Sequence, residues 1–296
     1  MSSRYIELLD DAESYMDERP DSALAVLRAM DPDMLPGRKA KAKYALLHSI
    51  ALDKNYIDLT TDSIIAPAVE YYRRRGDVES RFKCHYYQAR IHENSGDIDN
   101  ALLCAAKAEA LDTSKVSADM LCMLYGMKGT IYYDAWREKE AIEAGKLAGK
   151  YALEAGKYGH FVYYTMMMAL MYRNIGDWQS VAESLTEVED YAEYFTHRTV
   201  HLYNHIAIIQ KLNSDTSPED IVKYTEEYIT SYPQYDMISW KTVARVYLNS
   251  GDLEKAMVMI DRHREFGDIS NDPGYYAILS DILEADGNLI GALDAY

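Results

Sequence analysis

WKTVARVYLNSGDLEKA, residues 240–256, has the pattern of two helices joined by a tight turn. Gly251 can adopt the left-handed conformation that ends a helix, and the side chain of Asp252 can then cap the free amides at the start of the next helix. Ala244 and Ala256 lie seven residues before and five residues after the glycine. Side chains this small allow two helices to approach closely. The stretch therefore predicts an antiparallel helical hairpin.

The same pattern recurs along the chain, which indicates an internal repeat. Gly-Asp also occurs at residues 76–77, 96–97 and 176–177, with Gly-Asn as a variant at 287–288. In a divergent copy Trp136 replaces the turn glycine, at 40 residues from the turns on either side. A gap of 75 residues before Gly251 leaves room for one more copy around Asn213. Small residues keep register with the other turns: Ala89, Ala101, Ala169, Ser280 and Ala292.

Apolar residues between the turns recur with the period of an α-helix, as Ile6, Leu9 and Ala12 illustrate. No segment shows the alternation of a β-strand. Connections of about 2 to 6 residues are typical of helices that pack against their sequence neighbours. We therefore expect an all-α fold with roughly sixteen helices.

These residues resemble the tetratricopeptide repeat family, whose unit is a helix-turn-helix with an aromatic residue, a small residue, a tyrosine, a turn glycine and an alanine at fixed offsets. Trp240, Ala244, Tyr247, Gly251 and Ala256 match this pattern best. The resemblance implies a right-handed superhelix, a solenoid of antiparallel helix pairs. It covers residues 62–296, where repeats of 36 to 40 residues exceed the usual length of about 34. We expect residues 1–61 to form N-terminal helical pairs continuous with this array, and the last repeat to be truncated.

The N-terminal part, which includes PDSALAVLRAMDP at residues 20–32, also resembles a group of bacterial repeat proteins common in Bacteroides-type organisms. That resemblance implies an exported or membrane-anchored array, such as the sensing part of a larger signalling or regulatory protein. The longest apolar stretch, residues 161–172, has 12 residues, whereas a membrane-spanning helix needs about 20. We interpret it as a buried helix. Two locations of the protein are therefore left open: exported or membrane-anchored, and cytoplasmic.

The composition narrows the classes of partner. The chain has 296 residues, and 31 lysines and arginines against 48 aspartates and glutamates give a formal net charge of −17. Such a surface repels a phosphate backbone and an anionic membrane, so we expect no nucleic acid and no direct membrane contact. The three cysteines show no metal-type spacing, and we interpret them as free core residues.

No catalytic constellation is visible. His197, His201 and His205 follow one another at intervals of four residues, a spacing at which a histidine pair can hold zinc. The outer two are separated by about 12 Å along a helix, too far to share a metal ion. GxSxG, a phosphate-binding glycine loop and a cysteine tied by motif to a histidine are all missing from the sequence. We therefore predict a chain that is not an enzyme and uses no metal and no cofactor.

Tyrosine is unusually frequent, with 27 tyrosines against 4 phenylalanines. A tyrosine ring combines apolar area with a hydroxyl, which suits a recognition surface. In the tetratricopeptide family the first helix of each unit lines a concave face, and the resemblance carries groove-facing roles to positions thirteen, ten, six and three residues before each turn. The candidate peptide-binding residues at these positions are Lys83, Tyr86, Arg90, Thr130, Tyr133, Tyr163, Arg173, Lys241 and Arg245.

Five of these nine residues are basic, an exception in so acidic a chain. Arginines and lysines on one concave surface can hold an acidic or carboxylate-ended peptide. The alternative is that they form ion pairs with neighbouring helices. Two functions therefore stay open: a module that binds a protein or peptide segment in its groove, and a structural scaffold that self-associates or supports a further C-terminal domain. The sequence does not indicate an oligomeric state.

Overall fold

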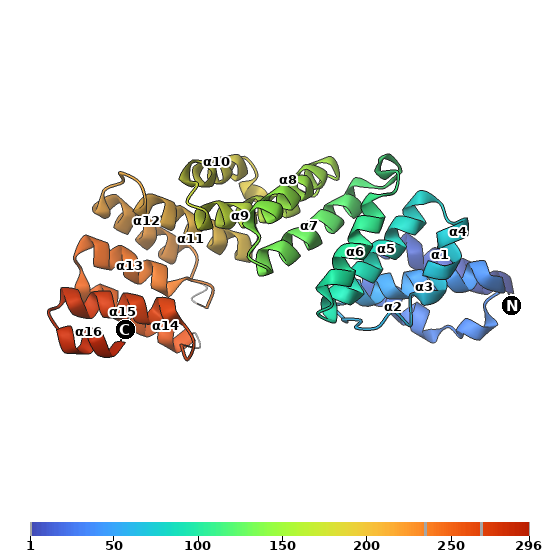
Figure 1. The fold of residues 1–296 in the computed structure, drawn as a ribbon, viewed down its shortest axis with the longest axis horizontal. Helices are drawn as coiled ribbons and strands as arrows, with labels where there is room; N and C mark the ends of the chain where they lie inside the picture. Colours follow the sequence, from blue (N-terminus) through green and yellow to red (C-terminus); the bar gives the residue numbers. More distant parts are fainter. Residues whose placement is uncertain (1, 234–235, 267–268, 296) are drawn as a thin grey trace. The chain divides into compact units, whose positions relative to one another are not determined.

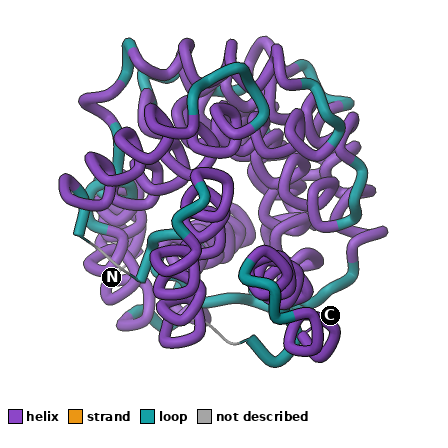
Figure 2. The backbone as a smooth tube through the Cα atoms, turned by 90° about the vertical axis from the view of Figure 1, so that its left-hand side faces the viewer, coloured by secondary structure: helices purple, strands orange, loops and turns teal. Residues whose placement is uncertain are grey.

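The computed structural model describes residues 2–233, 236–266 and 269–295 of the chain. Within these ranges it contains sixteen α-helices, three short 3-10 helices and no β-strand. The tube in Figure 2 accordingly consists of helix and loop. This confirms the all-α prediction and the expected number of helices. None of the described helices is long and apolar enough to span a membrane.

The helices form two compact units, Met1–Lys157 and Tyr158–Tyr296. The boundary that we placed between residues 61 and 62 marks where the match to the repeat pattern begins. In the structure it falls inside the first unit, between α3 (Gly37–Lys54) and α4 (Ala66–Arg75). These two helices contact each other directly, so the packing continues across that point.

In the first unit each odd-numbered helix packs against the even-numbered helix after it, and α1, α3, α5 and α7 also contact one another in succession. Its core includes the fully buried side chains of Leu9, Leu27, Phe82 and Leu124. The three cysteines, all in this unit, are buried and form no disulfide bond with one another, as predicted. Besides α3 and α4, the unit contains α1 (Ser2–Ser14), α2 (Pro20–Ala29), η1 (Pro32–Met34), α5 (Val78–Asn94), α6 (Ile98–Glu109), η2 (Thr113–Lys115), α7 (Ala118–Asp134) and α8 (Glu138–Glu154) (Figure 1).

The second unit repeats this arrangement. Its paired helices have a core that includes Ile208, Trp240, Ile260 and Ile282. The apolar stretch at residues 161–172 lies within the first helix of this unit and is largely buried, as predicted. The elements are α9 (Tyr158–Asn174), α10 (Trp178–Glu189), η3 (Ala192–Tyr194), α11 (His197–Leu212), α12 (Pro218–Ser231), α13 (Trp240–Ser250), α14 (Leu253–Phe266), α15 (Pro273–Ala285) and α16 (Leu289–Ala295).

The hairpin turns have the left-handed backbone that the repeated glycines predict. The φ angles are 78° at Gly96, 76° at Gly176, 83° at Gly251 and 81° at Gly287. After α13 the amide of Asp252 donates to the carbonyl of Tyr247 at 3.0 Å, which closes the end of that helix. The carboxylate of Asp252 accepts from the amide of Lys255 at 3.0 Å and caps α14. One dipeptide therefore ends a helix and begins the next.

The turn prediction was wrong at Gly76, whose φ of −84° and ψ of 151° are those of extended backbone. Gly76 joins α4 to α5, the second helix of one pair to the first helix of the next, so it is not a hairpin turn. A Cβ atom at this position would lie 2.8 Å from a ring carbon of Tyr72, which explains why glycine fits here. Asp77 does cap α5 as predicted, because its carboxylate accepts from the amide of Ser80 at 2.7 Å.

The small residues in register with the turns lie where paired helices cross. In α7 the equivalent residue is Gly129, and a Cβ atom there would lie only 3.8 Å from the carbonyl oxygen of Ala141 in α8. The backbones of α7 and α8 therefore approach closely. Five of the alanines at these positions are completely buried: Ala89, Ala101, Ala169, Ala244 and Ala256.

We predict that Gly251→Ala lowers the free energy of unfolding by about 1 kcal/mol, because an L-residue is strained at a left-handed φ. Gly159→Ala is the matched control, since Gly159 lies in α9 and a Cβ atom there meets only the carbonyl oxygen of Tyr194 at 3.6 Å. That change should leave stability unchanged or raise it by up to about 1 kcal/mol. Urea titrations of both variants measure the effects, and equal losses would contradict the turn assignment.

Candidate functional site

A cleft of about 300 Å³ lies on the face that α1, α3, α5 and α7 share in the first unit. These are the first helices of successive pairs, so the cleft lies on the face to which the repeat resemblance assigns recognition. Its lining consists of Glu13, Met16, Asp17, Leu47, Ile50, Lys54, Glu79, Lys83, Tyr87, Ser117, Asp119, Met120 and Met123.

Apolar side chains make up nearly half of this lining. Met16 follows α1, Met120 and Met123 come from α7, and Leu47 and Ile50 come from α3. Met123 is half-buried, whereas the other four are buried. Methionine side chains are flexible and polarizable, so they adapt to differently shaped apolar groups. The cleft therefore offers a deformable apolar surface.

The charged groups of the cleft are paired with one another. Lys54 Nζ lies 2.9 Å from Asp17 Oδ1, and Lys83 Nζ lies 2.9 Å from Glu79 Oε1. The hydrogen bond from Lys54 lowers the pKa of the Asp17 carboxyl, which stays ionised at neutral pH. Asp119 pairs with Lys157, outside the lining. The lining of the cleft is therefore polar in part, but its charges are largely neutralised by ion pairs.

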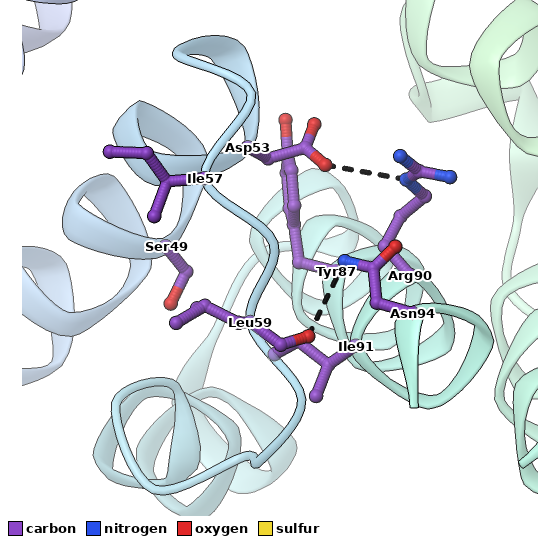
Figure 3. A pocket seen from close by; sticks show the side chains of 8 residues that line it. All are labelled: Ser49, Asp53, Ile57, Leu59, Tyr87, Arg90, Ile91 and Asn94. Carbon is purple, nitrogen blue, oxygen red and sulfur yellow. Dashed lines mark hydrogen bonds and ion pairs between the residues drawn. The ribbon is translucent and has the colours of Figure 1, made fainter. Parts of the chain in front are cut away.

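A second pocket lies beside the cleft, between α3, the loop after it and α5 (Figure 3). At about 10 Å³ it has room for no more than a single water molecule. Arg90 Nε donates to Asp53 Oδ1 at 3.3 Å, and Asn94 Nδ2 donates to the carbonyl oxygen of Leu59 at 3.3 Å (Figure 3). These bonds connect α3 and the loop after it to α5, so we interpret this pocket as part of the helix packing.

Arg90 is surrounded by carboxylates rather than exposed to a groove. It forms ion pairs with Asp53 of α3 and Glu93 of α5. Burial opposes its charge, but Tyr86, Glu93 and Asp53 outweigh that effect and raise the pKa of the guanidinium. The ion-pair alternative that the sequence left open is therefore the one found at Arg90.

The basic candidates of the second unit are also bound to other side chains of the chain. Lys241 Nζ lies 2.9 and 2.8 Å from the two carboxylate oxygens of Asp272, and Arg245 Nη1 lies 2.6 Å from Asp281 Oδ2. Arg173 donates to the side-chain oxygen of Asn174 at 2.9 Å. Four of the five basic candidates thus hold carboxylates of their own chain, three of them between neighbouring elements.

The uncharged candidates are less uniform. Tyr86 is only 3% exposed and packs against Tyr87 at a ring separation of 4.9 Å, so it does not present its ring to a partner. Thr130 is exposed, and its hydroxyl donates to the carbonyl of Gly126. Tyr133 is half-buried. Tyr163 is also half-buried, and the guanidinium of Arg198 lies 5.6 Å from its ring centre. None of the three lines the cleft.

Of the nine candidate residues, Lys83 is therefore the one that the cleft includes, and Met123, which lies at an equivalent position thirteen residues before Trp136, lines it as well. Positions counted back from a turn glycine could not identify Leu47 or Met16, because α1 and α3 have no such glycine. Tyr87 and Met120 stand nine and sixteen residues before their turns, outside the four positions used.

The three spaced histidines have separate environments. His197 is exposed, His201 Nδ1 lies 2.6 Å from the hydroxyl of Tyr228, and His205 Nδ1 lies 3.1 Å from the hydroxyl of Thr242. Within the described residues no cluster of histidine, cysteine and carboxylate side chains is arranged to hold a metal ion. His201 and His205 therefore join α11 to α12 and α13.

We predict that His205 makes the protein less stable as the pH falls from about 6.5 to 4. Burial, Arg173 and Lys241 lower its pKa in the folded state to about 4, from 6.5. The unfolded chain therefore binds the proton first, and stability falls by up to about 3 kcal/mol over this window. Unfolding measured against pH should show a shallower loss for His205→Gln, whereas His197→Gln should follow the unmodified protein. Identical slopes for all three would contradict the assignment.

Comparisons with known proteins place the fold. No protein-family model and no curated protein matches the sequence. Among solved structures, the apo form of RapI matches with a TM-score of 0.70 and 12% identity, covering 99% of this chain and 95% of that one. A tetratricopeptide repeat protein from Parabacteroides merdae gives a TM-score of 0.53, 12% identity and coverages of 98% and 90%. A Rap protein complexed with competence and sporulation factor gives a TM-score of 0.56 and 12% identity, covering 100% of this chain and 86% of that one. The chain therefore has a tetratricopeptide-like helical-repeat fold.

Proposed function

We propose that this chain is a non-catalytic module that binds an extended segment of another protein in the cleft of the first unit. The observation that carries the proposal is the lining itself, in which adaptable apolar side chains from α3, α7 and the turn after α1 lie among ion pairs. One protein with a similar fold is described in complex with competence and sporulation factor, which supports binding as the use of such an array.

The bound segment should contribute apolar side chains rather than a run of carboxylates. The lining carries four carboxylates and two ammonium groups, and both of those ammonium groups already hold an acid. An acidic or carboxylate-ended peptide, which the basic positions suggested, would have to displace carboxylates of the chain itself. Burial of an apolar side chain against Met16, Met120 and Met123 requires no such exchange.

We predict that a selection from a library of random displayed peptides yields sequences rich in apolar residues that bind the full chain. Met123→Lys should weaken these peptides at least tenfold, or about 1.4 kcal/mol, because it places a charge in the apolar lining. Fluorescence anisotropy measures the affinity.

Leu103→Lys is the matched control. Leu103 is 51% exposed on α6 and does not line the cleft, so this change should leave binding intact. If peptides bind both variants equally, the cleft is not the site. If the library yields no binder at all, the scaffold alternative, in which ion pairs between helices serve only packing, becomes the better description.

A further inference from the structure

Two aromatic residues adopt a backbone conformation that L-residues avoid. Tyr56 has a φ of 57° and Trp136 a φ of 56°, and among the described residues no other position except glycine has a positive φ. Each is the second residue after its helix, α3 or α7, which is the place that Gly96 takes after α5. Glycine adopts this conformation without strain, whereas a side chain opposes it.

Folding gains little from these two rings. Tyr56 is 94% exposed and Trp136 is 80% exposed, so neither recovers the strain by burying apolar area. A residue that adopts a strained backbone conformation, and gains no packing from it, indicates a role other than folding. Tryptophan and tyrosine are also the residues that most often dominate binding at protein interfaces.

The two rings lie along one edge of the first unit. α3, α5 and α7 run in the same direction, because one antiparallel helix separates each from the next, so their C-terminal ends share an edge (Figure 1). Adjacent helices in contact lie 8–10 Å apart, which separates the two turns by about 20 Å. An extended segment of about six residues spans that distance. Ile57 and Ile98, at 37% and 38% exposure, add apolar surface on the same edge.

This edge is negatively charged. Asp58, Asp99 and Asp134 are exposed, and none of them is in an ion pair in the described part of the chain. Glu93 lies close to two further carboxylates: burial raises its pKa most, Asp53 and Asp134 add to the rise, and Arg90 opposes it.

The cations near this edge do not neutralise it. Lys54 is held by Asp17 at 2.9 Å, and Arg137 by Glu140 at 2.6 Å. Lys139 adds one exposed positive charge. The excess of negative charge on this edge disfavours an anionic partner and favours a cationic one.

We propose that this edge of the first unit binds an extended basic segment of another protein, with two lysine or arginine side chains lying on the rings of Tyr56 and Trp136. Cations are attracted to the faces of aromatic rings, and tryptophan gives the strongest such contact. The carboxylates of the edge pair with the remaining cations of the segment. Neither Tyr56 nor Trp136 lines the cleft, so variants at these two residues test this proposal independently of the first.

The test uses the full chain and a fluorescent twelve-residue peptide in which lysine and arginine alternate with serine, with a glutamate peptide of equal length as the negative probe. Tyr56→Gly combined with Trp136→Gly should weaken the basic peptide at least tenfold. Thermal stability should not fall, because glycine relieves the strain. Tyr56→Phe with Trp136→Phe should retain most of the affinity, and Asp58→Asn with Asp134→Asn should reduce both affinity and its dependence on salt.

Three results would overturn the proposal. The first is equal binding to the glycine double variant. The second is a loss of binding in the asparagine variant alone, which would indicate attraction by net charge without the rings. The third is self-association, measured by sedimentation, that depends on both rings and disappears when Arg73, Arg74 and Arg75 are changed to alanine. In that case the edge would serve a second copy of this chain.

Discussion

The left-handed residue that follows the first helix in most of the described pairs is the constraint on which the rest of the array depends. In a short hairpin such as that between α13 and α14 it reverses the chain, and the amide that follows it returns to the last turn of the helix, as Asp252 does to Tyr247. The reversal places the two helices antiparallel and in contact. Buried alanines such as Ala244 and Ala256 then allow the close crossing. Without the turn, the apolar faces of the two helices would have no fixed register in which to stack on the next pair.

Local features of this kind were predictable from sequence, because their causes lie within about ten residues. Gly251, Asp252 and the alanines around them specify the hairpin by conformational preference and size alone. Gly76 shows the limit of such reasoning, since the same dipeptide stands in a connection between pairs, where glycine fits because of the close approach of Tyr72. The sequence pattern does not distinguish these two reasons for a glycine.

The candidate site was less predictable, because ion pairing is decided by residues distant in sequence. Arg90 meets Asp53, and Lys241 meets Asp272, 31 residues away. A count of basic residues on one face cannot reveal that their charges are already used. Removing one partner leaves a partly buried charge unpaired, so these residues act first on helix packing. The apolar cleft was missed for a related reason: α1 and α3, which form half of it, lack the turn glycine that set the frame.

At Tyr56 and Trp136 a local backbone constraint coincides with charges contributed by residues from several parts of the sequence. A left-handed L-residue costs about 1–2 kcal/mol, a substantial fraction of the 5–15 kcal/mol by which folded domains are usually stable. Gly96 shows that the turn between them is made at no such cost. Their rings are exposed at the ends of helices, on an edge where exposed carboxylates add negative charge. A residue in the turn after a helix points away from the packed face of that helix, so it can carry an exposed contact without disturbing the packing.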